Sequence, residues 1–113
     1  MGTTTKLLKA YGLPTHRPPT SPGETVAHFL EDLDLSQAEA ARALGLSANR
    51  LNEVVKNKRG ISADTALRLA RFFGTDAQSW LNLQQQYDIQ CAQDALGKAL
   101  IAIRPWHDAS AAA

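Results

Sequence analysis

Apolar residues recur with a helical period through most of the chain, and no stretch alternates between apolar and polar residues as a half-buried strand would. Between residues 23 and 33 one face repeats at the spacing i, i+3, i+4, i+7: Val26, Phe29, Leu30 and Leu33. Residues 63–73 carry a second, broader face: Ala66, Leu67, Leu69, Ala70 and Phe73. The pattern predicts an all-α protein.

Capping residues mark five helix starts. Ser21 precedes Pro22 and Glu24, Ser36 pairs with Glu39 as a capping box, and Ser47 and Ser62 are simpler N-caps. The run from Thr75 to Gln78 is interpreted as a further capping box. These starts predict helices over residues 23–33, 37–44, 48–55 and 63–73, followed by a long C-terminal helix.

The C-terminal helix is expected to begin near Asp76 and to extend as far as Ile103, with Pro105 ending it. Its middle is rich in Gln, and Gly97 allows a break. Residues 89–104 therefore either continue this helix or form a separate one, and the sequence leaves both open.

A chain of 113 residues with 44% apolar content is large enough for one domain with a core of its own. We divide it into an N-terminal arm (1–20), a helical domain (21–104) and a tail (105–113). No apolar run approaches the ~20 residues of a membrane span, and the N-terminus has no apolar segment typical of a secretory signal. We expect a cytoplasmic protein that does not enter the membrane.

The net charge of +1 is uninformative, but the charges are unevenly distributed. Residues 20–35 hold four acidic and no basic residues, whereas residues 36–75 hold seven basic and three acidic residues. Binding to phosphate requires a local positive surface rather than a positive protein. The basic excess falls on the segment that carries the clearest motif.

That motif is a helix-turn-helix in residues 36–58. Two helices that cross steeply need a small residue at the crossing and a glycine that adopts positive φ in the turn. Counted from Gln37 as position one, Ala41 is the small residue at five and Gly45 the glycine at nine. Apolar residues fill positions eight, ten, fifteen and eighteen: Leu44, Leu46, Leu51 and Val54. An ordinary helical hairpin would not need this combination.

On a helical wheel the second helix of the motif turns Leu51, Val54 and Val55 to the core. Recognition helices present their N-terminal residues to base edges in the major groove. The base-reading candidates are therefore Ala48, Asn49, Arg50 and Glu53, because Arg, Asn and Glu suit guanine, adenine and cytosine. Asn52 could reach either a base or the backbone. Phosphate contacts are expected from Gln37, Ser47, Lys56, Asn57, Lys58 and Arg59.

Other chemistry has little support. His16, His28, His107 and Cys91 share no spacing typical of a metal site, so we expect no metal or other cofactor. The sequence offers neither a glycine-rich phosphate loop nor a nucleophile beside a base, and we do not expect an enzyme.

Four stretches within residues 16–92 are typical of one known family: Arg17–Thr20, Asn49–Glu53, Lys58–Ala70, and Trp80–Gln84 with Tyr87 and Asp88. In these stretches the chain resembles the HigA-type antitoxins, a branch of the phage-repressor (Xre/Cro) helix-turn-helix family. The resemblance implies a homodimer that binds a palindromic operator upstream of its own operon. It also implies that the chain neutralises a HigB-type toxin, a small ribonuclease that cuts mRNA on the ribosome.

By position the family's DNA-facing helix corresponds to Ser47–Val55 and its dimerisation helix to the C-terminal one, with Trp80, Leu83 and Tyr87 at the dimer contact. The arm before Pro18 and the extension after Ala92 lie outside the resemblance, and their length differs among relatives, so toxin contacts do not transfer residue by residue. We expect them on the arm, the first helix and the acidic residues Glu31, Asp32 and Asp34, because ribonucleases carry basic surfaces. Two alternatives remain: a stand-alone repressor without a toxin, and a protein-interaction module that has lost DNA binding.

Overall fold

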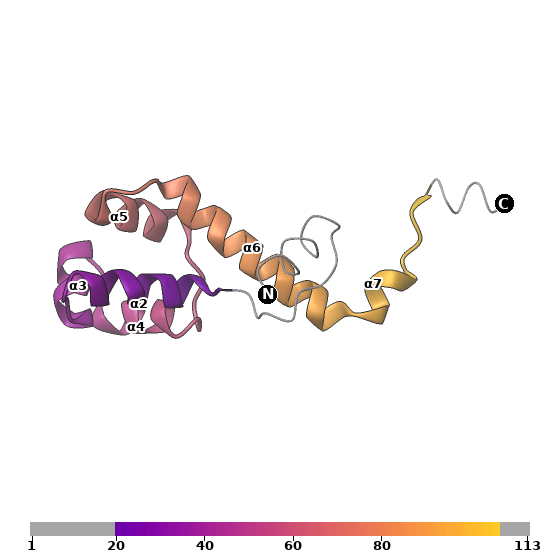
Figure 1. Cartoon of the computed structure of the whole chain (residues 1–113), viewed down its shortest axis with the longest axis horizontal. Helices are drawn as coiled ribbons and strands as arrows, with labels where there is room; N and C mark the ends of the chain where they lie inside the picture. Colours follow the sequence, from indigo (N-terminus) through magenta and orange to yellow (C-terminus); the bar gives the residue numbers. More distant parts are fainter. Residues whose placement is uncertain (1–19, 107–113) are drawn as a thin grey trace, which may run out of the picture.

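The computed structural model describes residues 20–106, in which all regular secondary structure is α-helical. The helices are α2 (Pro22–Asp32), α3 (Gln37–Leu44), α4 (Ala48–Val55), α5 (Ala63–Phe73), α6 (Ala77–Leu96) and α7 (Lys98–Ala102). Helices α2 to α5 form a bundle, and α6 runs away from it toward α7 (Figure 1). The predicted all-α fold class is confirmed.

The predicted arm and tail fall largely on residues 1–19 and 107–113, which lie outside the described residues. The division into arm, domain and tail therefore stays a prediction. Within residues 20–106 no helix combines the length and the apolar character needed to cross a membrane.

Four of the helices begin at the predicted serine caps. Ser21, Ser36, Ser47 and Ser62 each accept a hydrogen bond from the backbone N–H three residues later. At α3 the box is complete, because the Ser36 N–H also donates to Glu39 Oε1 at 3.1 Å. The hydrogen bond from the Ser36 N–H stabilises the ionised carboxylate and is the main cause that lowers the pKa of Glu39, and the Ser36 side chain adds to it.

The predicted capping box at Thr75 is wrong by one residue. Asp76 is the N-cap of α6, and its Oδ2 accepts from the Ser79 N–H at 3.0 Å. The Thr75 hydroxyl instead accepts from the Trp80 indole N–H at 2.8 Å. A buried indole needs an acceptor for its N–H, and Thr75 supplies it at the turn between α5 and α6.

The core lies between α2, α3, α4 and α5, and the start of α6 closes it. Its buried apolar residues are Val26, Leu30, Ala40, Ala41, Leu44, Leu46, Leu51, Val54, Ile61, Ala66, Leu69 and Trp80. An aromatic cluster joins three helices at one side of this core. The Phe29 ring lies 4.8 Å from that of Phe73 and 5.5 Å from that of Trp80, between centroids.

Two residues assigned to apolar faces are exposed instead. Leu33 follows the last residue of α2 and is 53% exposed, because the chain turns away at Asp34, where φ is +54°. Leu67 is 64% exposed. It lies about 100° around the helix from Ala66, on the opposite side from Leu69 and Phe73, so that packing of that face leaves Leu67 outside.

The sequence left open whether residues 89–104 continue the long helix or form a separate one, and the structure shows a break within them. Helix α6 ends at Leu96, Gly97 adopts φ +48° and ψ −118°, and the short helix α7 follows. A non-glycine residue rarely adopts a positive φ, so Gly97 permits the change of direction. Beyond the bundle α6 and α7 leave large apolar side chains exposed: Ile89, Leu96, Leu100 and Ile101, with Ile103 and Trp106 after them.

Candidate nucleic-acid interface

The turn between α3 and α4 has the geometry that the motif requires. Gly45 adopts the left-handed conformation at φ +72°, ends α3, and lets the Leu46 N–H donate to the Ala41 carbonyl at 2.9 Å. Ala41 is 2% exposed, since its small side chain lies in the core cluster. All six predicted structural positions of the motif adopt the expected burial or backbone conformation.

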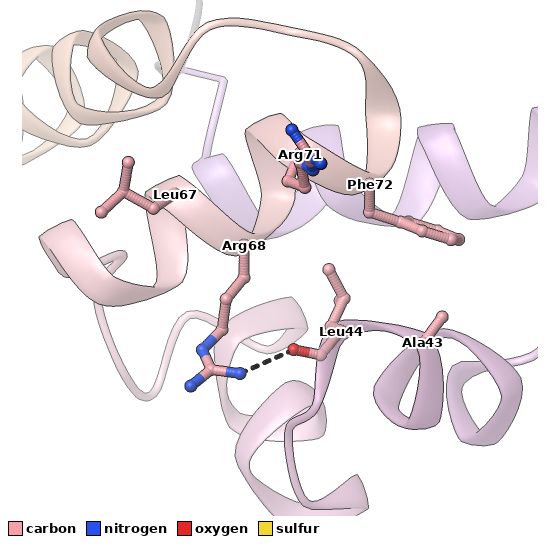
Figure 2. A pocket seen from close by; sticks show the side chains of 6 residues that line it. All are labelled: Ala43, Leu44, Leu67, Arg68, Arg71 and Phe72. Atoms are coloured by element: carbon pink, nitrogen blue, oxygen red, sulfur yellow. Dashed lines mark hydrogen bonds between the residues drawn. The ribbon is translucent and has the colours of Figure 1, made fainter.

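Helix α5 braces this turn from outside. Arg68 donates through Nη1 to the Leu44 carbonyl at 2.9 Å and to the Gly45 carbonyl at 3.3 Å. Figure 2 shows Arg68 extending from α5 toward the Leu44 carbonyl oxygen. Both residues line a groove of about 450 Å³ between α5 and the end of α3. These carbonyls have no partner within α3, so the guanidinium supplies the donors that the helix end lacks.

Asp64 connects Arg68 to α4, the second helix of the motif. Its Oδ1 accepts from Arg68 Nε at 2.7 Å and from Arg50 Nη2 at 3.4 Å. The hydrogen bond from Arg68 is the main cause that lowers the pKa of the Asp64 carboxyl, and Arg50 adds to it. One carboxylate in the first turn of α5 thus links both helices of the motif to α5.

Helix α4 turns two faces as predicted. Leu51 and Val54 are fully buried, whereas Ala48 and Asn49 at its start and Lys56 at its end are exposed. Ser47 is occupied as the N-cap, since its Oγ accepts from the Arg50 N–H at 3.1 Å. The exposed start of α4 therefore presents Ala48 and Asn49 to solvent.

Arg50, another of the predicted base-reading residues, directs its side chain partly toward α5. Its Nη2 donates to the buried Thr65 hydroxyl at 3.1 Å as well as to Asp64, and 34% of its side chain is exposed. The Arg50 Nε is buried without a hydrogen-bond partner among residues 20–106. The side chain thus braces α4 against α5, and base contact by Arg50 stays a prediction.

Glu53 is likewise engaged within the chain. Its Oε1 accepts from Asn49 Nδ2 and its Oε2 from Arg59 Nε, each at 3.0 Å. Its backbone carbonyl accepts from the N–H groups of Lys58 and Arg59 at 2.8 and 3.2 Å. One residue of α4 therefore holds the segment that follows the helix, in which the Lys58 and Arg59 side chains remain exposed.

Two further candidates bond each other. Asn52 donates through Nδ2 to Gln37 Oε1 at 3.2 Å, so the first residue of α3 lies beside the middle of α4. Both side chains are half-buried. The Gln37 amide group and Asn52 Oδ1 form no other hydrogen bond in the described part of the chain, and a contact to DNA from either stays a prediction.

Asn57, expected to bind phosphate, joins α4 to α2. At φ +58° it donates through Nδ2 to Ser21 Oγ at 2.9 Å and accepts from the Gly23 N–H at 3.0 Å. A Cβ on Gly23 would lie 2.3 Å from the Val55 carbonyl oxygen, which shows how closely α2 approaches the end of α4. Both polar atoms of the Asn57 amide are used in this contact.

Arg68, Thr65 and Gln84 have structural roles that were not predicted from the sequence. Asp64 and Arg68 at spacing i, i+4 were a usable signal for an ion pair, but nothing local indicates that Arg68 also reaches the turn at Leu44. Gln84 on α6 accepts through Oε1 from the Ile61 N–H at 2.8 Å and so fixes the segment between α4 and α5.

The three residues expected at a dimer contact differ in exposure. Trp80 is 4% exposed and belongs to the core of the single chain, whereas Leu83 and Tyr87 are half-buried on α6. Little of the Trp80 side chain is left for a partner, so a dimer contact on this part of α6 would use Leu83 and Tyr87. Residues 20–106 contain no cluster of three or more His, Cys, Asp or Glu side chains that could hold a metal ion.

Comparison with known proteins agrees with this geometry. A family model described as helix-turn-helix matches residues 27–80. Virulence-associated protein I of Dichelobacter nodosus is 51% identical over 77 residues, covering 67% of this chain and 71% of that protein.

Two solved structures resemble this chain over nearly their whole length. The Pseudomonas aeruginosa antitoxin HigA, determined with the higBA promoter, is 47% identical, with 77% of this chain and 97% of that chain covered at a TM-score of 0.73. An addiction module antidote protein of the HigA family from Coxiella burnetii is 43% identical, with 79% and 99% covered at a TM-score of 0.75. The chain belongs to the HigA-type antitoxins, a branch of the phage-repressor (Xre/Cro) helix-turn-helix family.

Proposed function

We propose that this chain is the antitoxin of a type II toxin–antitoxin pair and the repressor of its own operon. Two copies bind a palindromic operator with one α4 in each half-site, and the chain also binds and neutralises a HigB-type toxin that cleaves mRNA. It acts in the cytoplasm by binding alone, without catalysis or a cofactor.

The observation that carries this proposal is that α4, the proposed recognition helix, is firmly held on its buried face while polar and basic side chains remain exposed. Helix α4 is anchored on its buried face by Leu51 and Val54 and braced at both ends, while Ala48, Asn49 and Lys56 stay exposed. Lys58 and Arg59 extend the exposed basic surface beyond its end. A rigid helix with polar groups at its exposed start suits base reading in the major groove, and flanking cations suit phosphate. The P. aeruginosa relative, determined with promoter DNA, supports the same use of the fold.

Dimerisation through α6 is the second part of the proposal. Leu83 and Tyr87 lie at i, i+4 on one side of α6 and are only half-buried in a single chain. Burial of these side chains against a second copy would remove apolar surface from water. The two recognition helices would then lie about one turn of DNA apart, ~34 Å.

Toxin binding is the third part. Glu31, Asp32 and Asp34 are exposed at the end of α2, and none of them pairs with Lys or Arg within residues 20–106. An acidic surface of this kind suits a basic ribonuclease. The arm also proposed for this contact lies outside the described residues.

Two experiments test the proposal. An electrophoretic mobility shift with the DNA upstream of the gene should show a complex of two chains per palindrome. If the upstream DNA binds no more tightly than random DNA of the same length, operator binding is refuted. If the product of the neighbouring reading frame is the toxin, its expression alone should inhibit growth, and co-expression of this chain should restore growth. A growth defect unaffected by this chain would instead favour a stand-alone repressor.

The acidic surface is tested separately. The triple change of Glu31, Asp32 and Asp34 to Ala should weaken toxin binding in titration calorimetry and leave the operator shift unchanged. Intact toxin affinity in this variant would remove the three residues from the toxin contact.

A further inference from the structure

Glu53 has an unusual position for an acidic residue on a DNA-facing helix. It lies on the exposed side of α4, where a carboxylate would be repelled by phosphate, yet its side chain is only 29% exposed. Both carboxylate oxygens are already used: Oε1 accepts from Asn49 Nδ2 and Oε2 from Arg59 Nε, each at 3.0 Å. Because both oxygens already accept a hydrogen bond within the chain, this carboxylate is poorly placed to accept another from a base.

The two donors come from opposite ends of the recognition element. Asn49 lies in the first turn of α4, and Arg59 lies four residues after the helix ends at Val55. Glu53 also fixes the Arg59 backbone, because its carbonyl accepts from the Arg59 N–H at 3.2 Å. Position and side-chain direction of Arg59 thus depend on the same residue.

Both donors keep the groups that read bases. Asn49 uses one of its two amide hydrogens, and its Oδ1 forms no hydrogen bond among residues 20–106, so the pair of groups that recognises adenine remains available. Arg59 is held through Nε alone, and its Nη1 and Nη2 form no hydrogen bond in the same residues. That end of the guanidinium is the fork that binds guanine or phosphate.

We propose that Glu53 is a positioning residue that holds Asn49 and Arg59 as one linked pair of DNA-contacting side chains. Glu53 reads no base itself, and sequence discrimination by Asn49 and Arg59 depends on its carboxylate. Fixing long side chains before binding lowers the entropy lost on contact, which is how such a residue adds to specificity. This inference rests on the proposed function, since it assumes that α4 enters the major groove.

The variant Glu53→Gln separates this role from direct reading. A carboxylate accepts at both oxygens, whereas an amide accepts at one and donates at the other. Glutamine must therefore give up either the Asn49 or the Arg59 hydrogen bond with almost no change of shape. Glu31→Gln removes one negative charge from the exposed surface of α2 and is the matched control.

The experiment measures affinity for the operator, for every single-base-pair variant of one half-site, and for random DNA. The proteins are the full-length wild type, Glu53→Gln, Asn49→Ala, Arg59→Ala, the double variant Asn49→Ala/Glu53→Gln, and the control. Glu53→Gln should lose discrimination, by roughly fivefold or more, at base pairs that Asn49→Ala or Arg59→Ala also relaxes. Affinity for random DNA should stay equal or rise, because a negative charge is gone.

Non-additivity is the decisive result. The double variant should discriminate at the Asn49 base pair no worse than Asn49→Ala alone. Additive losses would overturn the proposal, and so would relaxation by Glu53→Gln at a base pair that neither Asn49→Ala nor Arg59→Ala affects. Equal weakening on all DNA would mean that Glu53 only supports folding, which would also overturn it.

A double-mutant cycle of Asn49→Ala and Arg59→Ala, measured as operator discrimination, repeats the test with Glu53 intact and does not depend on the folding of Glu53→Gln. The two residues share no direct hydrogen bond, so coupling between them supports the link through Glu53 and independence refutes it. If the wild type itself does not distinguish the operator from random DNA, the proposed function fails. If it does and the cycles show no coupling, only this inference fails.

Discussion

Arg68 Nη1 lies 2.9 Å from the Leu44 carbonyl oxygen, so a side chain of α5 completes the end of α3 at the turn of the motif. The same guanidinium bonds Asp64, which in turn bonds Arg50 on α4. The angle between the two helices of the motif is therefore supported by three charged residues outside the turn as well as by Gly45 and the core.

Replacement of Arg68 by Ala should lower the free energy of unfolding by roughly 1–3 kcal/mol, because two carbonyls lose a charged donor. Arg71→Ala is the matched control, since Arg71 is an exposed arginine one turn along the same helix. Urea unfolding followed by circular dichroism measures both. Equal stability of the two variants would contradict a bracing role for Arg68.

Gly23→Ala should be strongly destabilising, because Gly23 is buried where α2 approaches the end of α4. The added Cβ would lie 2.3 and 2.5 Å from the carbonyl oxygens of Val55 and Val54, so α2 must move away from α4. Such overpacking costs about 1–3 kcal/mol or more. The control is Gly60→Ala, where the nearest atom lies at 3.4 Å. The two melting temperatures should differ clearly, and similar values would show that α2 gives way easily.

Asp64→Asn should alter the dependence of stability on pH. The folded pKa of Asp64 is lowered from its ordinary value of 3.8, mainly by Arg68, so its ionised form stabilises the fold. That contribution is complete above the ordinary pKa and is lost as the pH falls through the lowered folded value. The variant should therefore be less stable than the wild type at pH 7, and the difference should vanish as the pH drops below 3.8. A constant difference down to pH 2 would contradict this linkage.

Arg50→Ala should reduce stability as well as DNA reading. The Arg50 hydrogen bond to the buried Thr65 hydroxyl contributes about 1 kcal/mol, and its loss leaves that hydroxyl without this donor. If Arg50 also contacts a base, preference at one base pair should relax by roughly 1–3 kcal/mol. Thermal unfolding and operator titration, performed on the same preparation, separate the two effects. Reduced stability with unchanged discrimination would assign Arg50 to the fold alone.

Lys58→Ala should weaken binding to all DNA sequences alike and reduce the slope of log affinity against log salt by about one unit. Lys58 is exposed just after α4 and forms no side-chain hydrogen bond among residues 20–106. Lys98→Ala in α7 is the control, since that lysine lies far along the chain from the recognition helix (Figure 1). An unchanged slope would show that Lys58 does not touch phosphate.

The sequence by itself determined the helices and the motif. Serine caps, helical periodicity and the spacing of Ala41 and Gly45 are local features, and local hydrogen bonds and steric limits act within a few residues. For that reason the predicted bounds of α3, α4 and α5 agree with the structure. The buried and exposed faces of α4 followed from helical geometry alone.

Only the tertiary structure decided how the polar side chains of the motif are used. Arg50 turns toward Thr65, Asn57 toward Ser21 and Gly23, and Arg68 toward the turn, across separations of 15 to 36 residues. It also decided that Leu33 and Leu67 stay exposed and that Gly97 ends α6. A periodic pattern states which face of a helix is apolar, but the partners of a long polar side chain depend on which helices meet, and packing alone determines that.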